Sequence, residues 1–157
     1  MLRPEFLIPA ITFLVALGSF FIRPRDIPWA IRLDRPNWLF FEPAIPLIWT
    51  IIFICGAWSA VIVWKSQPAS LQTLAFMGLY LFVELVTVSY IPATLRLRSL
   101  EIGTILGGLG FLAGVGLTFL VWPLSGKAAL LLLPYLLWSP IGTYTTRRMI
   151  DLNPGAL

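Results

Sequence analysis

Long apolar runs separated by short polar segments dominate the pattern of this chain. A helix that crosses a lipid bilayer needs about 20 consecutive, mainly apolar residues. The sequence holds five runs of about that length, and they cover residues 6–22, 44–64, 71–93, 100–122 and 128–146. The segments that join the later runs are so short that consecutive helices must be antiparallel neighbours. The pattern therefore predicts an all-α integral membrane protein, a five-transmembrane-helix bundle.

Composition supports a membrane protein with one domain. Hydrophobic residues make up 59% of the 157 residues and charged residues only 11%, whereas roughly a quarter of the residues in a soluble domain are charged. No polar block is long enough to fold separately, so we expect a single domain over residues 1–157. The first run lacks the basic flank and the A-x-A cleavage site of a signal peptide, so we expect it to remain as a span.

Basic residues are distributed unequally between the two ends of the predicted bundle. One end carries eight of the 11 Lys and Arg residues, namely Arg23, Arg25, Arg32, Arg35, Arg96, Arg98, Arg147 and Arg148. The other end carries Arg3, Lys65 and Lys127. The positive-inside rule then predicts that the first loop and the C-terminus are cytoplasmic and that the N-terminus is on the opposite side. This bias also accounts for most of the basic net charge, so no nucleic acid partner is expected.

The residue types that are present restrict the chemistry of the chain. It has no histidine, and its one cysteine, Cys55, lies within the second run. Histidine is the common protein ligand of zinc and haem iron, so we expect no metal site and no required cofactor. Catalytic arrangements of the Ser-His-Asp or Cys-His type are excluded for the same reason.

Glycines cluster in the fourth predicted span. They form two pairs four residues apart, Gly103 with Gly107 and Gly110 with Gly114. In lipid, small residues at this spacing allow a second helix to approach closely. The stripe fits packing within one protomer or the seam of a homodimer, and the spacing alone does not choose between them.

Glu84 lies near the middle of the third predicted span. An ionised carboxyl group at the bilayer centre costs at least ~2.5 kcal/mol, so we expect Glu84 to be protonated, paired or turned toward a polar cavity. Tyr80 and Thr87 share its helix face. Three roles stay open: a hydrogen bond that joins two helices, the lining of a ligand cavity, and a proton path.

Two tryptophans lie well inside apolar runs rather than at the span ends, where this residue usually anchors a helix. Trp49 shares a face of the second span with Phe53, and Trp138 shares a face of the fifth span with Gly142. Each face changes from bulky to small along the helix. The pattern predicts a space between the two helices that is closed by indole rings.

The first loop, residues 23–43, is the one long polar connection, yet it is rich in large apolar side chains. These side chains are Trp29, Leu33, Trp38, Phe40 and Phe41. They would be buried if the loop lay as a lid across the mouth of the bundle. Alternatively, the loop could rest on the lipid headgroups, with its arginines on phosphates and its rings in the interface.

Three stretches of the chain resemble the TspO/MBR family of tryptophan-rich sensory proteins and mitochondrial translocator (peripheral benzodiazepine receptor) proteins. They are WAIRLDRPNW at residues 29–38, PLIWTIIFICGAWSA at 46–60 and PYLLWSPIGTYTTRRMIDLN at 134–153. The order of these stretches, the five spans and the long first loop agree along nearly the whole chain. The resemblance implies a five-helix bundle whose first loop covers a pocket for tetrapyrroles, sterols and synthetic aromatic ligands.

By motif, the resemblance assigns Trp29, Leu33 and Trp38 to the lid and the faces of Trp49 and Trp138 to the pocket walls. The full set of predicted ligand-binding residues is Trp29, Leu33, Trp38, Ile45, Trp49, Phe53, Glu84, Thr87, Trp138 and Gly142. In the third span the usual Asn and Trp of the family are Glu84 and Thr87 here, and the usual Tyr of the first loop is Ala30. We therefore expect a ligand preference that differs from that of other members.

Three functions follow as hypotheses. The first is binding of a porphyrin, a haem-type tetrapyrrole or a sterol-like molecule, with a sensory, regulatory or carrier role; the resemblance also implies a homodimer in contact with membrane lipid. Some family members have been credited with light-dependent porphyrin breakdown, and in a membrane enzyme of that kind Trp49 and Trp138 would be the catalytic candidates. The third hypothesis is an assembly subunit without a small-molecule ligand.

Overall fold

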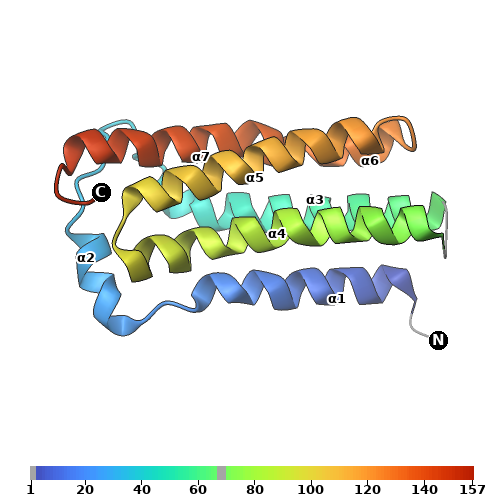
Figure 1. Cartoon of the computed structure of the whole chain (residues 1–157), viewed down its shortest axis with the longest axis horizontal. Helices are drawn as coiled ribbons and strands as arrows, with labels where there is room; N and C mark the ends of the chain where they lie inside the picture. The colour runs from blue at the N-terminus through green and yellow to red at the C-terminus, as the bar shows by residue number, and fades with distance from the viewer. Residues whose placement is uncertain (1–2, 67–69) are drawn as a thin grey trace.

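A computed structural model describes residues 3–66 and 70–157, and within these ranges the secondary structure is helical, without strands. Figure 1 shows the long helices as rods that run side by side. The elements are α1 (Pro4–Ala16), η1 (Leu17–Phe20), η2 (Pro24–Asp26), α2 (Ile27–Ile31), η3 (Glu42–Ala44), α3 (Ile45–Ser66), α4 (Leu71–Leu97), α5 (Leu100–Val121), α6 (Gly126–Leu131) and α7 (Leu133–Leu152).

The long helices have the length and composition of membrane spans. Four segments qualify on their own: Glu42–Ser66, Leu71–Leu97, Leu100–Val121 and Gly126–Leu152. A fifth is added when Pro4–Phe20 and Pro24–Ile31, which are bent by 56° relative to each other, are counted as one. The prediction of an all-α membrane bundle is confirmed.

The first predicted span and the first loop differ in detail from the sequence pattern. The α-helix ends at Ala16 and continues only as the 3₁₀ turn η1 to Phe20, at a point where Gly18 lowers the helix propensity. The loop that follows is not irregular throughout, because it contains η2, α2 and η3. Pro24 and Pro28 lie in the first turns of η2 and α2, where the N–H that proline lacks is not needed.

The fifth predicted span is broken at Leu132 into α6 and α7. The Leu132 N–H donates to the carbonyl oxygen of Ala129 (3.1 Å), which leaves the Ala128 carbonyl without its usual helical donor. The Ser59 hydroxyl on α3 donates to that Ala128 oxygen (2.7 Å) and lies 2.6 Å from the Tyr80 hydroxyl on α4. The break therefore leaves no unpaired Ala128 carbonyl in the bilayer, where such a group costs several kcal/mol.

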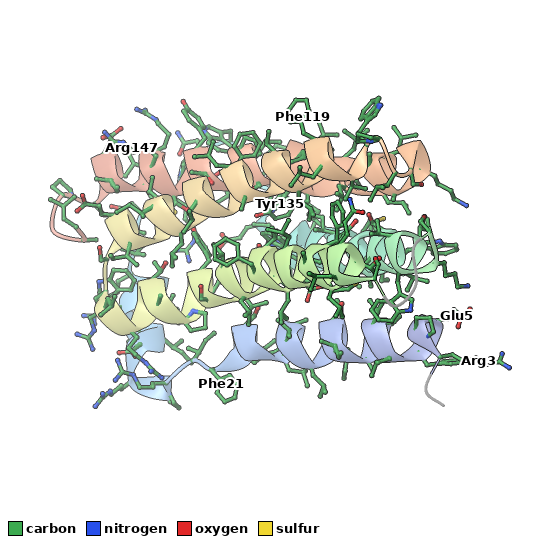
Figure 2. The ribbon with its side chains drawn as sticks, turned by 45° about the vertical axis from the view of Figure 1, so that its right-hand side comes forward. Arg3, Glu5, Phe21, Phe119, Tyr135 and Arg147 are labelled. Atoms are coloured by element: carbon green, nitrogen blue, oxygen red, sulfur yellow. The ribbon has the colours of Figure 1, made fainter. Side chains whose placement is uncertain are left out.

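Helices α4, α5 and α7 form a closely packed half of the bundle. The glycines of the α5 stripe, Gly103, Gly107, Gly110 and Gly114, face side chains of α4 and α7. A Cβ atom at Gly114 would lie 2.5 Å from the Tyr135 ring, and one at Gly103 would lie 2.6 Å from the Thr94 hydroxyl. Figure 2 shows Tyr135 inside the bundle. The stripe serves packing within one protomer, which was the first of its two predicted uses.

Candidate ligand-binding cavity

A cavity of about 1110 Å³ lies between the helices of the other half of the bundle. Its wall is formed by α1, α3 and α7, with contributions from η1, the first loop, α4 and α5. Phe13 on α1 and Trp58 on α3 belong to the wall and are also more than half exposed on the outside. The cavity therefore reaches the lipid-facing surface between these two helices.

The two tryptophans that the sequence singled out line this cavity together. The Trp49 ring on α3 lies 6.0 Å from the ring of Phe53 and 6.4 Å from that of Tyr135, measured between centroids. The Trp138 ring on α7 meets the edge of Phe41 at 6.1 Å. Each indole is thus held by a neighbouring ring, which favours a fixed aromatic wall.

Six of the ten predicted ligand-binding residues line the large cavity, namely Ile45, Trp49, Phe53, Thr87, Trp138 and Gly142. Glu84 lines a smaller cavity of about 40 Å³, whose wall shares Phe53, Thr87 and Tyr135 with the large one. Trp29, Leu33 and Trp38 do not line either cavity. The structure brings the span residues together and leaves these three loop residues outside.

The first loop covers the cavity with residues other than the predicted ones. Arg35, Leu39 and Glu42 line the wall, and Leu39 is buried. The Asp34 N–H donates to the Asn153 side-chain oxygen (2.8 Å), and the Asn153 amide donates back to the Asp34 carbonyl (2.9 Å). This pair of bonds ties the loop to the end of α7 and directs its second half across the mouth.

Trp38 lies against the outer side of α7 instead of the cavity. Its ring stacks on Tyr144 at 6.1 Å with an interplanar angle of 20°, and its side chain is 39% exposed. Tyr144 projects from the exposed face of α7, so it attracts the indole away from the mouth. The sequence pattern could not show which face of α7 the Trp38 ring contacts, because an aromatic side chain lies on each of two faces of this helix.

Glu84 joins two helices. Its carboxyl oxygen accepts a hydrogen bond of 2.8 Å from the Thr12 hydroxyl on α1. Thr12 is buried and also lines the large cavity. Of the roles predicted for Glu84, the structure shows the interhelical hydrogen bond and the lining of a cavity, although that cavity is the smaller one.

Polar side chains of α7 and α4 that are not among the ten predicted ligand-binding residues also line the cavity. On α7 they are Ser139, Thr143, Thr145 and Thr146, and on α4 the wall includes Tyr90, which bonds to Thr146. The Trp138 indole nitrogen and the Thr143 hydroxyl are buried without a hydrogen-bond partner among the described residues. The sequence does indicate this polar stripe, because the spacing of Ser139, Thr143 and Thr146 places three hydroxyl groups on one helix face.

Ion pairs lie at both ends of the cavity wall. Glu5 on α1 pairs with Lys65 on α3 at one end, and Figure 2 shows Glu5 at the end of the bundle that also holds Arg3. Arg35 pairs with Glu42 at the other end, with 2.9 Å between nitrogen and oxygen. The middle of the wall is mostly apolar and aromatic, so the arrangement suits an elongated or flat apolar guest with polar ends.

The comparisons with known proteins agree with this architecture. The TspO/MBR family model matches residues 6–151, which is nearly the whole chain. The chain belongs to the TspO/MBR family. This membership confirms the resemblance that was based on three sequence stretches.

Individual relatives of this TspO/MBR family protein are distant but cover most of it. Tryptophan-rich protein TspO of Bacillus cereus is 26% identical over 147 residues, which cover 91% of this chain and 95% of the relative. The uncharacterized membrane protein YtaB of Bacillus subtilis is 27% identical over 145 residues, with coverages of 91% and 92%. Translocator protein 2 of Mus musculus is 30% identical over 127 residues, with coverages of 80% and 73%.

Proposed function

We propose that this membrane protein binds a flat, hydrophobic molecule, of the tetrapyrrole or sterol type, in the cavity between α1, α3 and α7. The role of the binding would be sensory, regulatory or that of a carrier. The observation that carries the proposal is that Trp49 and Trp138, from two different spans, line one cavity of about 1110 Å³. Binding sites for small molecules are typically concave and apolar, with volumes of roughly 300–1,000 Å³.

The distribution of charge along the cavity favours a tetrapyrrole that carries acidic groups, such as protoporphyrin. The rings of Trp49, Phe53 and Trp138 offer faces and edges on which a macrocycle can stack. Arg35 and Lys65 lie at opposite ends of the wall, where a carboxylate on the edge of the ligand could exchange for Glu42 or Glu5. A sterol would fill the apolar middle of the cavity, but its hydroxyl would offer no negative charge to Arg35 or Lys65.

Titration with protoporphyrin tests the proposal. The Soret band of the porphyrin serves as the readout, since this signal does not depend on the indoles that are removed. Wild type is expected to saturate at micromolar porphyrin, whereas Trp49→Phe/Trp138→Phe is expected to bind about tenfold or more weakly, a loss of about 1.4 kcal/mol. The matched control is Trp64→Phe/Trp122→Phe, which removes two indoles that do not line the cavity.

Two results would count against the proposal. The first is the absence of saturable binding by wild type, tested with both protoporphyrin and a sterol. The second is an equal loss of affinity in the double variant and in its control, because binding would then not depend on the indoles of the cavity.

Light-dependent degradation of the bound porphyrin is the second candidate function. It is favoured by the same observation, because two oxidisable indoles line the space in which the porphyrin would lie. Illumination of the purified protein with protoporphyrin distinguishes an enzyme from a receptor. An enzyme gives a new product spectrum that is lost in Trp49→Phe/Trp138→Phe, whereas a receptor gives the same slow bleaching as porphyrin in detergent alone.

Membrane orientation and oligomeric state stay predictions. The positive-inside rule supports a cytoplasmic first loop and C-terminus, and cysteine-labelling at Arg32→Cys and Lys127→Cys in intact cells would report the two sides. A homodimer would need a surface other than the stripe of Gly103 to Gly114, which α4 and α7 of the same chain cover. Mass measurement in detergent would give the number of protomers.

A further inference from the structure

Four arginines and one aspartate lie at the segment η2–α2 and at the C-terminal end of α4, where these two parts of the chain approach each other. Asp26 is only 2% exposed, and its carboxylate accepts a hydrogen bond from Arg23 Nε (2.7 Å) and lies 3.6 Å from Arg98 Nη2. A second nitrogen of Arg23 donates to the backbone carbonyl of Arg96 (3.1 Å). Arg25 lies on η2, and Arg23 is the residue that precedes this element. We call Arg23, Arg25, Arg96 and Arg98, together with Asp26, the arginine cluster.

Positive charge exceeds negative charge in the arginine cluster. Asp26 is its one acidic member, and it pairs with Arg23 and Arg98. Arg25 and Arg96 are exposed and form no ion pair within residues 3–66 and 70–157. The guanidinium groups of Arg25 and Arg96 are therefore free to bind an anion at the same end of the bundle as the two that Asp26 holds in place.

The backbone fixes the position of this cluster. Arg98 has a left-handed conformation with φ of 51°, which ends α4 and turns the chain into α5. Ser99 then caps α5, because its hydroxyl accepts the N–H of Ile102 (3.2 Å). The guanidinium of Arg98 and the carbonyl of Arg96 are thus presented to η2 by a tight turn rather than by a long loop.

Exposed apolar side chains surround the cluster. Phe20 and Phe21 are 77% and 72% exposed just before η2, and Ile27 and Leu97 are exposed beside it. Figure 2 shows Phe21 pointing away from the bundle at the bend between α1 and the following segment. Because α4 is a membrane span that ends at Leu97, the bend beside this end lies near the level where hydrocarbon gives way to headgroups. An amphipathic molecule in the bilayer could contact the rings and the guanidinium groups at the same time.

We infer that the arginine cluster binds the phosphate of an anionic membrane lipid whose acyl chains lie on Phe20, Phe21 and Leu97. Guanidinium groups match phosphate oxygens in a bidentate geometry, and they are weakly hydrated compared with ammonium groups. A free phosphate would use the guanidinium groups but would leave the exposed rings without a partner. The combination of charge and apolar surface therefore points to the lipid.

Another pair of arginines at the same end of the bundle provides a comparison. Arg147 and Arg148 on α7 both pair with Asp151, at 3.5 and 2.9 Å. Figure 2 shows Arg147 at the end of the bundle opposite Arg3 and Glu5. Both of these guanidinium groups are already engaged, in contrast to Arg25 and Arg96. A double substitution here removes the same charge from the same end without touching the cluster.

Native mass spectrometry of the full chain in detergent tests the inference, with dioleoyl phosphatidylglycerol as the anionic lipid and dioleoyl phosphatidylcholine as the neutral one. Wild type is expected to bind phosphatidylglycerol more tightly than phosphatidylcholine. Each basic residue near an anionic lipid surface contributes about fivefold, so Arg25→Gln/Arg96→Gln is expected to bind phosphatidylglycerol about 25-fold more weakly. The control Arg147→Gln/Arg148→Gln is expected to keep the wild-type affinity.

Three results would overturn the inference. They are equal binding of the two lipids by wild type, equal losses in the two double variants, and displacement of the lipid by millimolar inorganic phosphate. The single variant Arg25→Gln keeps the test decisive if the double variant does not fold, because Arg25 is exposed and its loss breaks no bond of the cluster. It is expected to show about a fivefold loss, and an unchanged affinity would also overturn the inference.

Discussion

The two halves of this bundle are held together in different ways. In the half formed by α4, α5 and α7, glycines bring helices so close that an added Cβ at Gly103, Gly110 or Gly114 would overlap a neighbouring side chain. In the half that contains α1, a cavity of about 1110 Å³ separates the helices. Figure 1 shows α1 along one edge of the bundle and α5 with α7 along the other.

A few polar contacts add to helix packing in the open half. Thr12 bonds to Glu84, Glu5 pairs with Lys65, and Asp26 pairs with Arg98. In lipid, no hydrophobic effect drives helices together, so association depends on van der Waals contact and on interhelical hydrogen bonds. Close packing of α4, α5 and α7 therefore stabilises the fold, whereas the polar contacts help to hold α1 in place beside the cavity.

The largest expected effect comes from a methyl group added to the packed half. In Gly114→Ala the new Cβ would lie 2.5 and 2.9 Å from two atoms of the Tyr135 ring. We expect this overpacking to lower the free energy of unfolding by about 1–3 kcal/mol. Thermal unfolding in detergent, followed by circular dichroism, measures the change.

Gly116→Ala is the matched control on the same helix, because no atom lies within 4 Å of its added Cβ. It should stay within about 1 kcal/mol of wild type, with a gain favoured by the higher helix propensity of alanine. Equal destabilisation by the two substitutions would show that α5 is not held by close packing on one face.

A smaller effect is expected from the bond that joins α1 to α4. A double-mutant cycle with Thr12→Val, Glu84→Leu and the combined variant isolates the coupling between the two side chains. Interhelical hydrogen bonds in membrane proteins average about 0.6 kcal/mol, and we expect a coupling of about that size. A coupling of zero would remove this contact from the list of those that hold the open half.

The smallest expected effect is the stabilisation by the charge of Asp26, which is present at neutral pH and is lost in acid. Burial raises the pKa of Asp26, but the hydrogen bond from Arg23 and the charges of Arg23, Arg98 and Arg25 outweigh it and hold the pKa below its ordinary value of 3.8. The carboxylate therefore stabilises the folded chain above that pH, and this contribution is lost as the pH falls through the lowered value.

Thermal unfolding of wild type and Asp26→Asn between pH 7 and pH 3 measures this contribution. The midpoint of wild type should be higher at neutral pH, and the difference between the two proteins should shrink in acid. A difference that does not change with pH would mean that the pairing of Asp26 with Arg23 and Arg98 adds nothing through its charge.

Much of the fold could be predicted from the sequence because membrane spans depend on length and polarity. The predicted span at 71–93 corresponds to α4 (Leu71–Leu97), and that at 100–122 corresponds to α5 (Leu100–Val121). The predicted helix boundaries were less accurate where the backbone hydrogen bonds depart from those of a regular α-helix. Pro134, in the first turn of α7, is a local signal for the break at Leu132. The partner of the freed Ala128 carbonyl, Ser59, lies on another helix, and no local pattern could reveal that contact.

The site residues divide in the same way. Trp49 and Trp138 could be selected because helical periodicity places each of them on a defined face of a span. Trp29, Leu33 and Trp38 lie in a loop whose path depends on distant contacts, such as the bonds between Asp34 and Asn153. The loop residues that cover the cavity are instead Arg35, Leu39 and Glu42. Their position over the cavity is evident only in the structure.

The bond from Ser59 to the Ala128 carbonyl has a consequence for motion. The bend between α6 and α7 is tied to α3, because the Ala128 carbonyl at the bend accepts its hydrogen bond from Ser59, and movement of α6 away from α3 would leave that carbonyl unpaired in hydrocarbon. The α7 wall of the cavity is thereby anchored at its far end, close to Tyr80 on α4. The opposite wall, α1, is joined to α3 and α4 by the Glu5–Lys65 pair and the Thr12–Glu84 bond, so widening of the cavity at α1 would have to break these two contacts.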